Sequence, residues 1–168
     1  MLHVLMLFLA LGDDHCEQHK KTTETKQTGH TQHQHHAAVD QRGDQPEGMG
    51  FSHQKTRHTF RLLKDGGAIE VRAKDDESLK AVRSHLQEIA RLFTAGDFEK
   101  PQFIHGRVPD GVDVMKARGT AITYKYEEVE RGGRVRITTK DPAALEAVHR
   151  FLRFQIEDHR TGDKTAVE

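Results

Sequence analysis

The 168-residue chain has a single cysteine, no tryptophan and no excess of charge of either sign. With Cys16 as its only thiol, it can form no intramolecular disulfide. Lysine plus arginine number 26, and so do aspartate plus glutamate. This balance removes the electrostatic argument for an acidic membrane or a nucleic acid as partner, and we expect no nucleic-acid partner. Because only 35% of residues are apolar, we expect only part of the chain to pack into a core.

Long apolar runs are also scarce, and the clearest one lies at the N-terminus. Residues 2–11 are nearly all apolar, and Ala10 and Gly12 place small residues where a signal peptidase cleaves. The run is about half as long as a helix that spans a bilayer. We therefore predict a signal peptide over residues 1–12, export to the periplasm, and no permanent membrane anchor.

Histidine is the residue in excess, with 13 copies. Residues 13–48 are polar, show no helical or strand period, and are predicted to form a disordered linker. This linker places His30, His33, His35 and His36 within seven residues. Neutral imidazoles bind copper, zinc and nickel, so these four residues are predicted metal ligands. The alternative is a polar linker that is rich in histidine without a metal-binding role.

The remaining sequence contains an internal similarity that aligns Gly66 and Gly67 with Gly132 and Gly133. Residues 66–86 and 132–152 are identical at eight of 21 positions without a gap, where average composition gives about one or two. This similarity indicates a duplicated unit. The offset from Gly66 to Gly132 is the repeat spacing.

Each half of the duplication shows the pattern of two strands followed by a helix. Apolar residues alternate before and after each Gly-Gly pair, which predicts a β-hairpin. Asp75 and Asp141 then precede apolar residues spaced by three and four, which predicts a capped helix. We predict an α+β fold in which two tandem β-β-α repeats form a four-stranded antiparallel sheet covered by two helices. The duplicated domain is assigned to residues 49–160, with a short helical turn near residues 112–117 and a flexible tail over 161–168.

Candidate ligands also occur inside the predicted domain. Met49 and Met115 are separated by the repeat spacing, so the duplication places them at equivalent positions before the first strand of each half. His53 and His58 flank the entry to the first strand, and His105 lies in the long connection before Met115. Thioethers and imidazoles suit copper, Cu(I) in particular. The alternative is that the methionines fill gaps in the core and the histidines hydrogen-bond to backbone carbonyls.

Three other histidines are assigned structural roles. His85 and His149 lie at the edges of their helical apolar stripes, and His159 aligns with Phe93 and is expected to face the core. A basic group at the second hairpin has two interpretations, an anion-binding site or a solvated sheet face; its members are Lys125, Arg131, Arg134 and Arg136.

No motif of a known reaction is present. The sequence lacks a phosphate-binding glycine loop, a nucleophile elbow and a His-Glu-x-x-His zinc motif, so no catalytic residue is predicted. Three hypotheses remain open. The first is an exported copper- or zinc-binding accessory or sequestration protein. The second is a non-catalytic module that binds another protein or itself, and the third is an enzyme with His58, His105 or His149 as general base.

Three segments carry a resemblance to known proteins: Met49-Gly50-Phe51, Arg57-His58 and residues 151–156. Through them, residues 49–161 resemble small exported bacterial proteins of an uncharacterised family. The resemblance implies a bacterial origin and export, and it transfers no active residue.

Overall fold

The computed structural model describes residues 18–168 and divides the chain into two units, Met1–His35 and His36–Glu168. The predicted signal peptide and Cys16 lie outside the described residues. None of the helices within residues 18–168 has an apolar stretch that is long enough to cross a bilayer. The sheet and the helices that pack on it belong to the second unit.

Helix α1 (Gln18–Asp44) lies where the sequence predicts a disordered linker. The low apolar content of this segment favours disorder, but no proline interrupts residues 18–44, so the backbone is free to form a helix. The last turns of α1 are also held by the domain. Val39 is buried, Asp40 forms an ion pair with Arg160 at 2.7 Å, and Arg42 Nε donates to the carbonyl oxygen of Ile104 at 2.8 Å.

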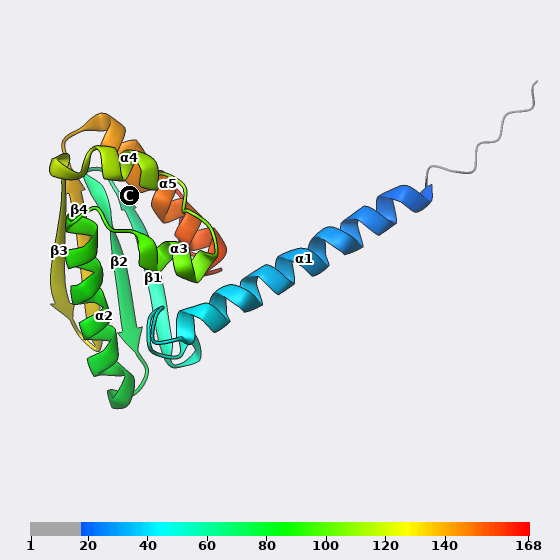
Figure 1. The fold of residues 1–168 in the computed structure, drawn as a ribbon, viewed down its shortest axis with the longest axis horizontal. Helices are drawn as coiled ribbons and strands as arrows, with labels where there is room; N and C mark the ends of the chain where they lie inside the picture. Colours follow the sequence, from blue (N-terminus) through cyan, green and yellow to red (C-terminus); the bar gives the residue numbers. More distant parts are fainter. Residues whose placement is uncertain (1–17) are drawn as a thin grey trace, which may run out of the picture. The chain divides into compact units, whose positions relative to one another are not determined.

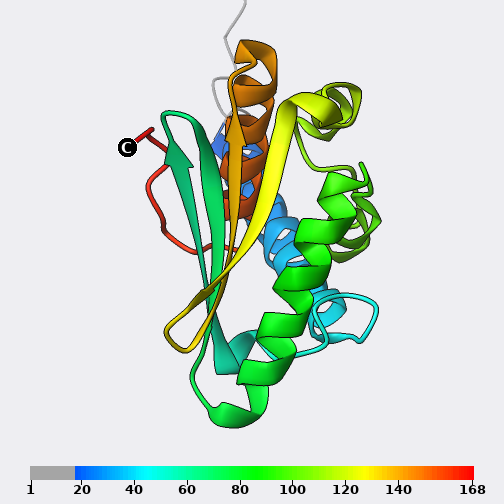
Figure 2. The ribbon, with the colours of Figure 1, turned by 90° about the vertical axis from the view of Figure 1, so that its left-hand side faces the viewer.

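A four-stranded antiparallel sheet forms the centre of the domain (Figure 1). Its strands are β1 (Thr56–Leu63), β2 (Gly66–Ala73), β3 (Ile122–Val129) and β4 (Gly132–Thr139), in the order β1-β2-β4-β3. The two hairpins, β1–β2 and β3–β4, lie side by side and join through β2 and β4 (Figure 2). The predicted α+β class and the four-stranded antiparallel sheet are confirmed.

Two long helices, α2 (Asp76–Thr94) and α5 (Pro142–Asp158), cover one face of the sheet. Asp75 Oδ1 accepts the Ser78 N–H at 2.8 Å, and Asp141 Oδ1 accepts the Ala144 N–H at 2.9 Å, as the capping prediction requires. Between the halves lie α3 (Glu99–His105), which the sequence analysis missed, and α4 (Val112–Ala117), which it predicted. Short 3-10 turns at His53–Lys55 and Gly119–Ala121 lead into β1 and β3.

Each long helix reaches the hairpin of the other half. Helix α2 follows β2 in sequence and contacts β3 and β4 as well as β2, while α5 follows β4 and contacts β1 and β2. Leu152 of α5 lies over Gly67, where an added methyl group would collide with Leu152 Cδ1. Leu86 of α2 lies over Gly133, where a methyl group would come within 3.1 Å of Leu86 Cδ1. The second glycine of each pair therefore makes room for a leucine from the other half.

Polar contacts follow the same crossed arrangement. His149 of α5 places Nε2 at 2.9 Å from the Leu63 carbonyl oxygen and 3.0 Å from that of Gly66, at the turn of the first hairpin. Arg83 of α2, which precedes His149 by the repeat spacing, donates from Nε to the carbonyl oxygen of Gly132 at 3.3 Å, at the second hairpin. His149 is thus a buried structural residue that joins α5 to the β1–β2 turn.

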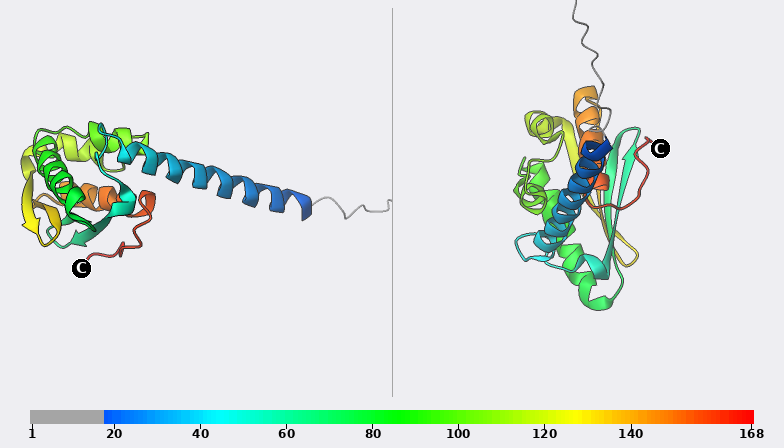
Figure 3. Two further views of the ribbon diagram at one scale, coloured as in Figure 1. Left: turned by 90° about the horizontal axis from the view of Figure 1, so that it is seen from below. Right: turned by 90° about the vertical axis from the view of Figure 1, so that its right-hand side faces the viewer.

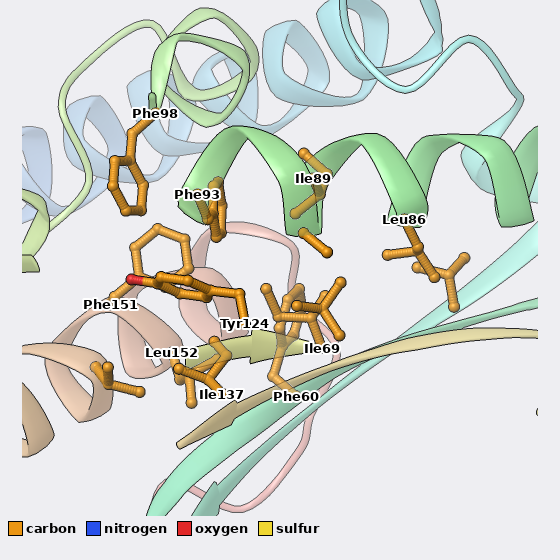
Figure 4. Packing of buried hydrophobic residues seen from close by; sticks show 14 of the residues in the cluster. Phe60, Ile69, Leu86, Ile89, Phe93, Phe98, Tyr124, Ile137, Phe151 and Leu152 are labelled. Atoms are coloured by element: carbon orange, nitrogen blue, oxygen red, sulfur yellow. The ribbon is translucent and has the colours of Figure 1, made fainter. Parts of the chain in front are cut away.

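The core is aromatic where α2, α5, β3 and Phe98, which precedes α3, meet (Figure 4). Phe93 stacks on Phe98 with ring centroids 4.4 Å apart, and meets Phe151 and Tyr124 edge-on at 5.8 and 5.6 Å. Edge-to-face and offset contacts of this kind add to the stabilisation from buried area. These phenylalanines supply the bulk that tryptophan often provides in other cores.

Substitution of Gly67 by alanine tests the space beneath Leu152. The added methyl group meets Leu152 Cδ1 and also lies 2.7 Å from the Arg61 carbonyl oxygen. We expect Gly67→Ala to lower the free energy of unfolding by about 1 to 3 kcal/mol, as overpacking does. Gly119→Ala is the control, since nothing lies within 4 Å of that position. Equal stability of both variants in urea unfolding would contradict the assignment.

Truncation of Leu86 and Leu152, the leucines that lie over the glycines of the other half, tests whether they are part of the core. Leu86 and Leu152 are 1% and 0% exposed. Leu86→Ala and Leu152→Ala should each cost about 2 to 5 kcal/mol of unfolding free energy, from lost transfer energy and the cavity that remains. Chemical denaturation measures the loss, and two silent variants would show that neither side chain is in the core.

Candidate metal site

A cavity of ≈ 50 Å³ lies between the sheet and the helices, and four imidazoles and one thioether line it. The lining polar and sulfur-bearing side chains are Met49, His58, His85, His105, Gln155 and His159. The rest of the wall is mainly apolar and comes from the core. A volume of this size holds one or a few atoms the size of water.

Elements far apart in the sequence deliver these side chains. Met49 follows α1, His58 lies on the inner side of β1, and His85 lies on α2. His105 ends α3, and His159 is the C-cap of α5. The site therefore exists only when both halves and the segment after α1 are assembled.

The histidine rings are in mutual contact. His58 and His159 stack with centroids 5.4 Å apart and an interplanar angle of 2°, and His105 meets His159 edge-on at 4.9 Å. Phe51 links His58, at 6.2 Å, to His85, at 5.5 Å. Within the described part of the chain, no hydrogen bond reaches a ring nitrogen of His58, His85 or His159.

Desolvation keeps three of these half-buried imidazoles neutral. Loss of water, followed by the charge of His53, lowers the pKa of His58 to about 4. Desolvation also lowers the pKa of His85 to about 3 and the pKa of His159 well below its usual value. At neutral pH these rings offer uncharged nitrogen lone pairs, which is the form that binds metals.

His105 is fixed by two buried polar residues of α5. Its Nδ1 lies 2.5 Å from Asp158 Oδ2, and its Nε2 lies 3.0 Å from Gln155 Oε1. The Gln155 Nε2 atom is buried and has no hydrogen-bond partner among residues 18–168. A carboxylate behind one ring nitrogen is a feature that orients metal-binding histidines, but the other nitrogen of His105 is engaged by Gln155.

The site is not a preformed coordination sphere. Among the described residues, no three His, Cys, Asp or Glu side chains are placed so that they could hold a metal ion. Stacked His58 and His159 face each other through their ring planes, whereas metal ligation uses the in-plane nitrogen lone pairs. Coordination by both rings therefore requires their side chains to rotate.

The structure separates the remaining predicted ligands of the domain from this cavity. His53 places Nδ1 at 3.0 Å from Asp44 Oδ1 and does not line the cavity. Met115 is fully buried in α4 and does not line it either. Of the five candidates proposed within the domain, Met49, His58 and His105 therefore lie together.

The linker histidines lie on α1 and are divided between the two units. His30, His33 and His35 belong to the first unit, and the side chain of His33 is exposed. His36 belongs to the second unit, and its Nδ1 lies 3.2 Å from the Asp158 carbonyl oxygen. A metal site shared by these four residues stays a prediction.

Sequence reasoning left three lining residues out of the metal site, namely His85, Gln155 and His159. A signal for His159 was present, since its alignment with Phe93 predicted that it faces the core. The helical stripe predicts His85 only at its boundary. Its relation to His58 depends on the angle at which α2 crosses the sheet, which a single sequence does not encode.

The basic group at the second hairpin takes part in ion pairs on the open sheet face. Arg134 donates from Nη2 to Glu70 Oε2 at 2.7 Å, and Arg136 Nη2 reaches Asp65 Oδ1 at 2.5 Å. Lys125 lies 3.7 Å from Glu127. These contacts favour the interpretation of a solvated, ion-paired face.

Comparison with models of known protein families, with curated proteins and with solved structures finds no match for this chain. Function is therefore inferred from the site alone.

The neutral histidines make stability depend on pH. In the unfolded chain each imidazole takes up a proton below about pH 6.5, whereas His58 does so in the fold only near pH 4. The contribution of neutral His58 to the free energy of unfolding is therefore fully present above pH 6.5 and is lost as the pH falls toward 4. Allowing for partial exposure of the ring, we expect His58→Phe to reduce the loss between pH 7.5 and 4.5 by about 1 to 2 kcal/mol in urea unfolding.

His33→Gln, at an exposed position, is the control for this experiment and should leave the loss unchanged. Equal pH dependence in His58→Phe and the parent would contradict the assignment of His58 as a desolvated, neutral ring.

Proposed function

We propose that this protein binds copper or zinc and acts as an exported metal-binding accessory or sequestration protein. One observation carries the proposal: a thioether and four imidazoles line one small cavity, and three of those imidazoles form no hydrogen bond within the described residues. Neutral imidazole nitrogens that make no hydrogen bond keep their lone pairs available, so they are candidates for metal ligands.

The chemistry of the lining favours Cu(I) over Zn(II). Among the described residues, no carboxylate lines the cavity, and Asp158, which lies behind His105, is engaged by that ring. Neutral ligands do not offset the charge of a buried ion. Among apolar side chains, the desolvation cost is therefore higher for a divalent ion than for a monovalent one. The Met49 sulfur is also a soft ligand, and soft ligands select Cu(I). Binding of an ion would require His58 or His159 to rotate, since the two rings stack face to face.

The histidines of the linker segment supply a second, weaker site in this proposal. His30, His33, His35 and His36 lie within seven residues of the sequence. Imidazoles this close along the chain bind copper, zinc or nickel without selecting one of them. We assign these four residues to capture of the ion outside the cavity.

Export is the remaining part of this proposal. The apolar residues 2–11, with small residues at Ala10 and Gly12, have the form of a signal peptide. We propose a periplasmic location in a bacterium, with the mature chain starting near Asp13. Mass spectrometry of the protein from the periplasmic fraction tests the position of cleavage.

We also propose that the domain arose from a duplicated β-β-α unit. The repeat spacing separates the first residues of β1 and β3, of β2 and β4, and of α2 and α5. The pairing of β2 with β4 is also symmetric between the two halves. At its centre Ile69 pairs with Val135, and these two residues are separated by the repeat spacing. The arrangement supports a common origin of the two halves.

The alternative is a protein-interaction module without metal. The observation in its favour is the sheet face opposite α2 and α5, on which charged side chains such as Glu70 and Arg134 form cross-strand ion pairs. Binding of a partner to this face would be indifferent to chelators. Loss of partner binding in the presence of a chelator would favour the metal hypothesis.

Metal titration with matched methionine variants tests the proposed site. Met49 lines the cavity and Met115 does not, and both are buried. In a background with His30, His33, His35 and His36 replaced by glutamine, we expect one Cu(I) per chain. Met49→Leu and His58→Phe should weaken its affinity by about tenfold or more, as loss of a ligand does.

Met115→Leu is the control in the same background and should leave Cu(I) affinity unchanged. The measurement is competition with a chromophoric Cu(I) chelator under anaerobic conditions, repeated with Zn(II). Absence of both Cu(I) and Zn(II) binding in this background would overturn the cavity proposal. Zn(II) bound more tightly than Cu(I) would overturn only the choice of ion.

A further inference from the structure

The two edges of the sheet differ in what covers them. Along β1, the C-terminal segment supplies partners for the outward backbone groups (Figure 3). The Phe60 N–H donates to Asp163 Oδ2 at 2.8 Å, and the Glu168 N–H donates to the Leu62 carbonyl oxygen at 2.9 Å. The Glu168 carboxylate also pairs with Arg61. The chain itself therefore covers the part of the β1 edge around Phe60 and Leu62.

No segment of the described chain covers the β3 edge in this way. Tyr126 and Glu128 follow Phe60 and Leu62 by the repeat spacing, and the two hairpins have equivalent registers, so their backbone groups also point away from the sheet. Within residues 18–168, no hydrogen bond reaches the outward backbone groups of Tyr126 or Glu128. An open row of N–H and C=O groups is a template for pairing with another strand.

We propose that β3 pairs with β3 of a second copy of this chain, antiparallel and about a two-fold axis at Tyr126. In this register the outward groups of Tyr124, Tyr126 and Glu128 form the new ladder, because each faces an outward group of the second copy. Lys125 then lies opposite Glu127 of the second copy, and Glu127 lies opposite its Lys125. Each pair joins opposite charges, which is favourable for residues directly across a sheet.

Charge also selects this register over its neighbours. A slip of two residues in one direction places Lys125 opposite Lys125 of the second copy. A slip of two residues in the other direction places Glu127 opposite Glu127. Like charges directly opposite each other are unfavourable, and a slip of one residue breaks the match of outward groups. The charges of Lys125 and Glu127 thus disfavour pairing of the β3 edge in other registers and with other strands.

The cover on the β1 edge favours an assembly of two copies. Pairing of β3 with β3 is isologous and uses each β3 edge once. Continued growth into a fibre would need a free edge on the far side of each sheet, and the C-terminal segment occupies that edge. The product is a dimer with one continuous eight-stranded sheet.

Sedimentation and light scattering of the full chain with charge-exchange variants test the dimer. We expect the parent to be a dimer at micromolar concentrations, and Lys125→Glu or Glu127→Lys alone to raise the dimer dissociation constant by about tenfold or more, since each puts two like-charge pairs at the interface. The double variant with both substitutions restores opposite charges and should return the dissociation constant to within about threefold of the parent.

Arg57→Glu serves as the control, because Arg57 is exposed on the covered β1 strand and should leave the dimer unchanged. Circular dichroism verifies that each variant is folded. A parent that stays monomeric at micromolar concentrations, or a dimer that both single variants leave intact, would overturn the proposal. Failure of the double variant to recover dimerisation would overturn the register at Tyr126. None of these outcomes depends on metal binding.

Discussion

The fold depends on the contact between a glycine of one half and a leucine of the other. Leu152 of α5 occupies the space above Gly67 in β2, and Leu86 of α2 lies above Gly133 in β4. A methyl group at Gly67 would overlap Leu152, and one at Gly133 would collide with the Tyr126 ring and crowd Leu86. The first glycine of each pair has a related role, because a methyl group at Gly66 or Gly132 would collide with backbone of the neighbouring central strand. The two Gly-Gly pairs thus bring β2 and β4 together and admit the crossed helices.

The cavity lies beneath the crossed helices. Helix α2 contributes His85, β1 contributes His58, and the end of α5, the helix that crosses to β1, adds His159. Neither half alone provides this set of imidazoles. The same packing removes water from the rings, which lowers the pKa of His58 to about 4 and the pKa of His85 to about 3 and keeps the rings uncharged. The proposed metal chemistry therefore rests on the same contacts that stabilise the domain.

Much of the fold was predictable because its signals are local. Alternation of apolar residues, the glycine turns and the caps at Asp75 and Asp141 define strands and helices within short windows. The crossing of α2 onto the second hairpin was not predictable, because either hairpin offers a suitable apolar face to either helix. The same is true of α3, which is short and begins without a side-chain cap at Phe98. Grouping of Met49, His58 and His105 was expected, but the expected partner Met115 lies elsewhere and His85 and His159 take part instead.

A double-mutant cycle tests the crossed packing most directly. Gly67→Ala is combined with Leu152→Ala, its neighbour across the halves, and separately with Leu86→Ala, which belongs to the same half as Gly67. The account predicts that truncation of Leu152 relieves part of the crowding, so the cross-half pair shows a coupling of about 1 kcal/mol or more, while the same-half pair is additive within about 0.5 kcal/mol. Coupling of Gly67 to Leu86 and not to Leu152 would contradict the crossed arrangement.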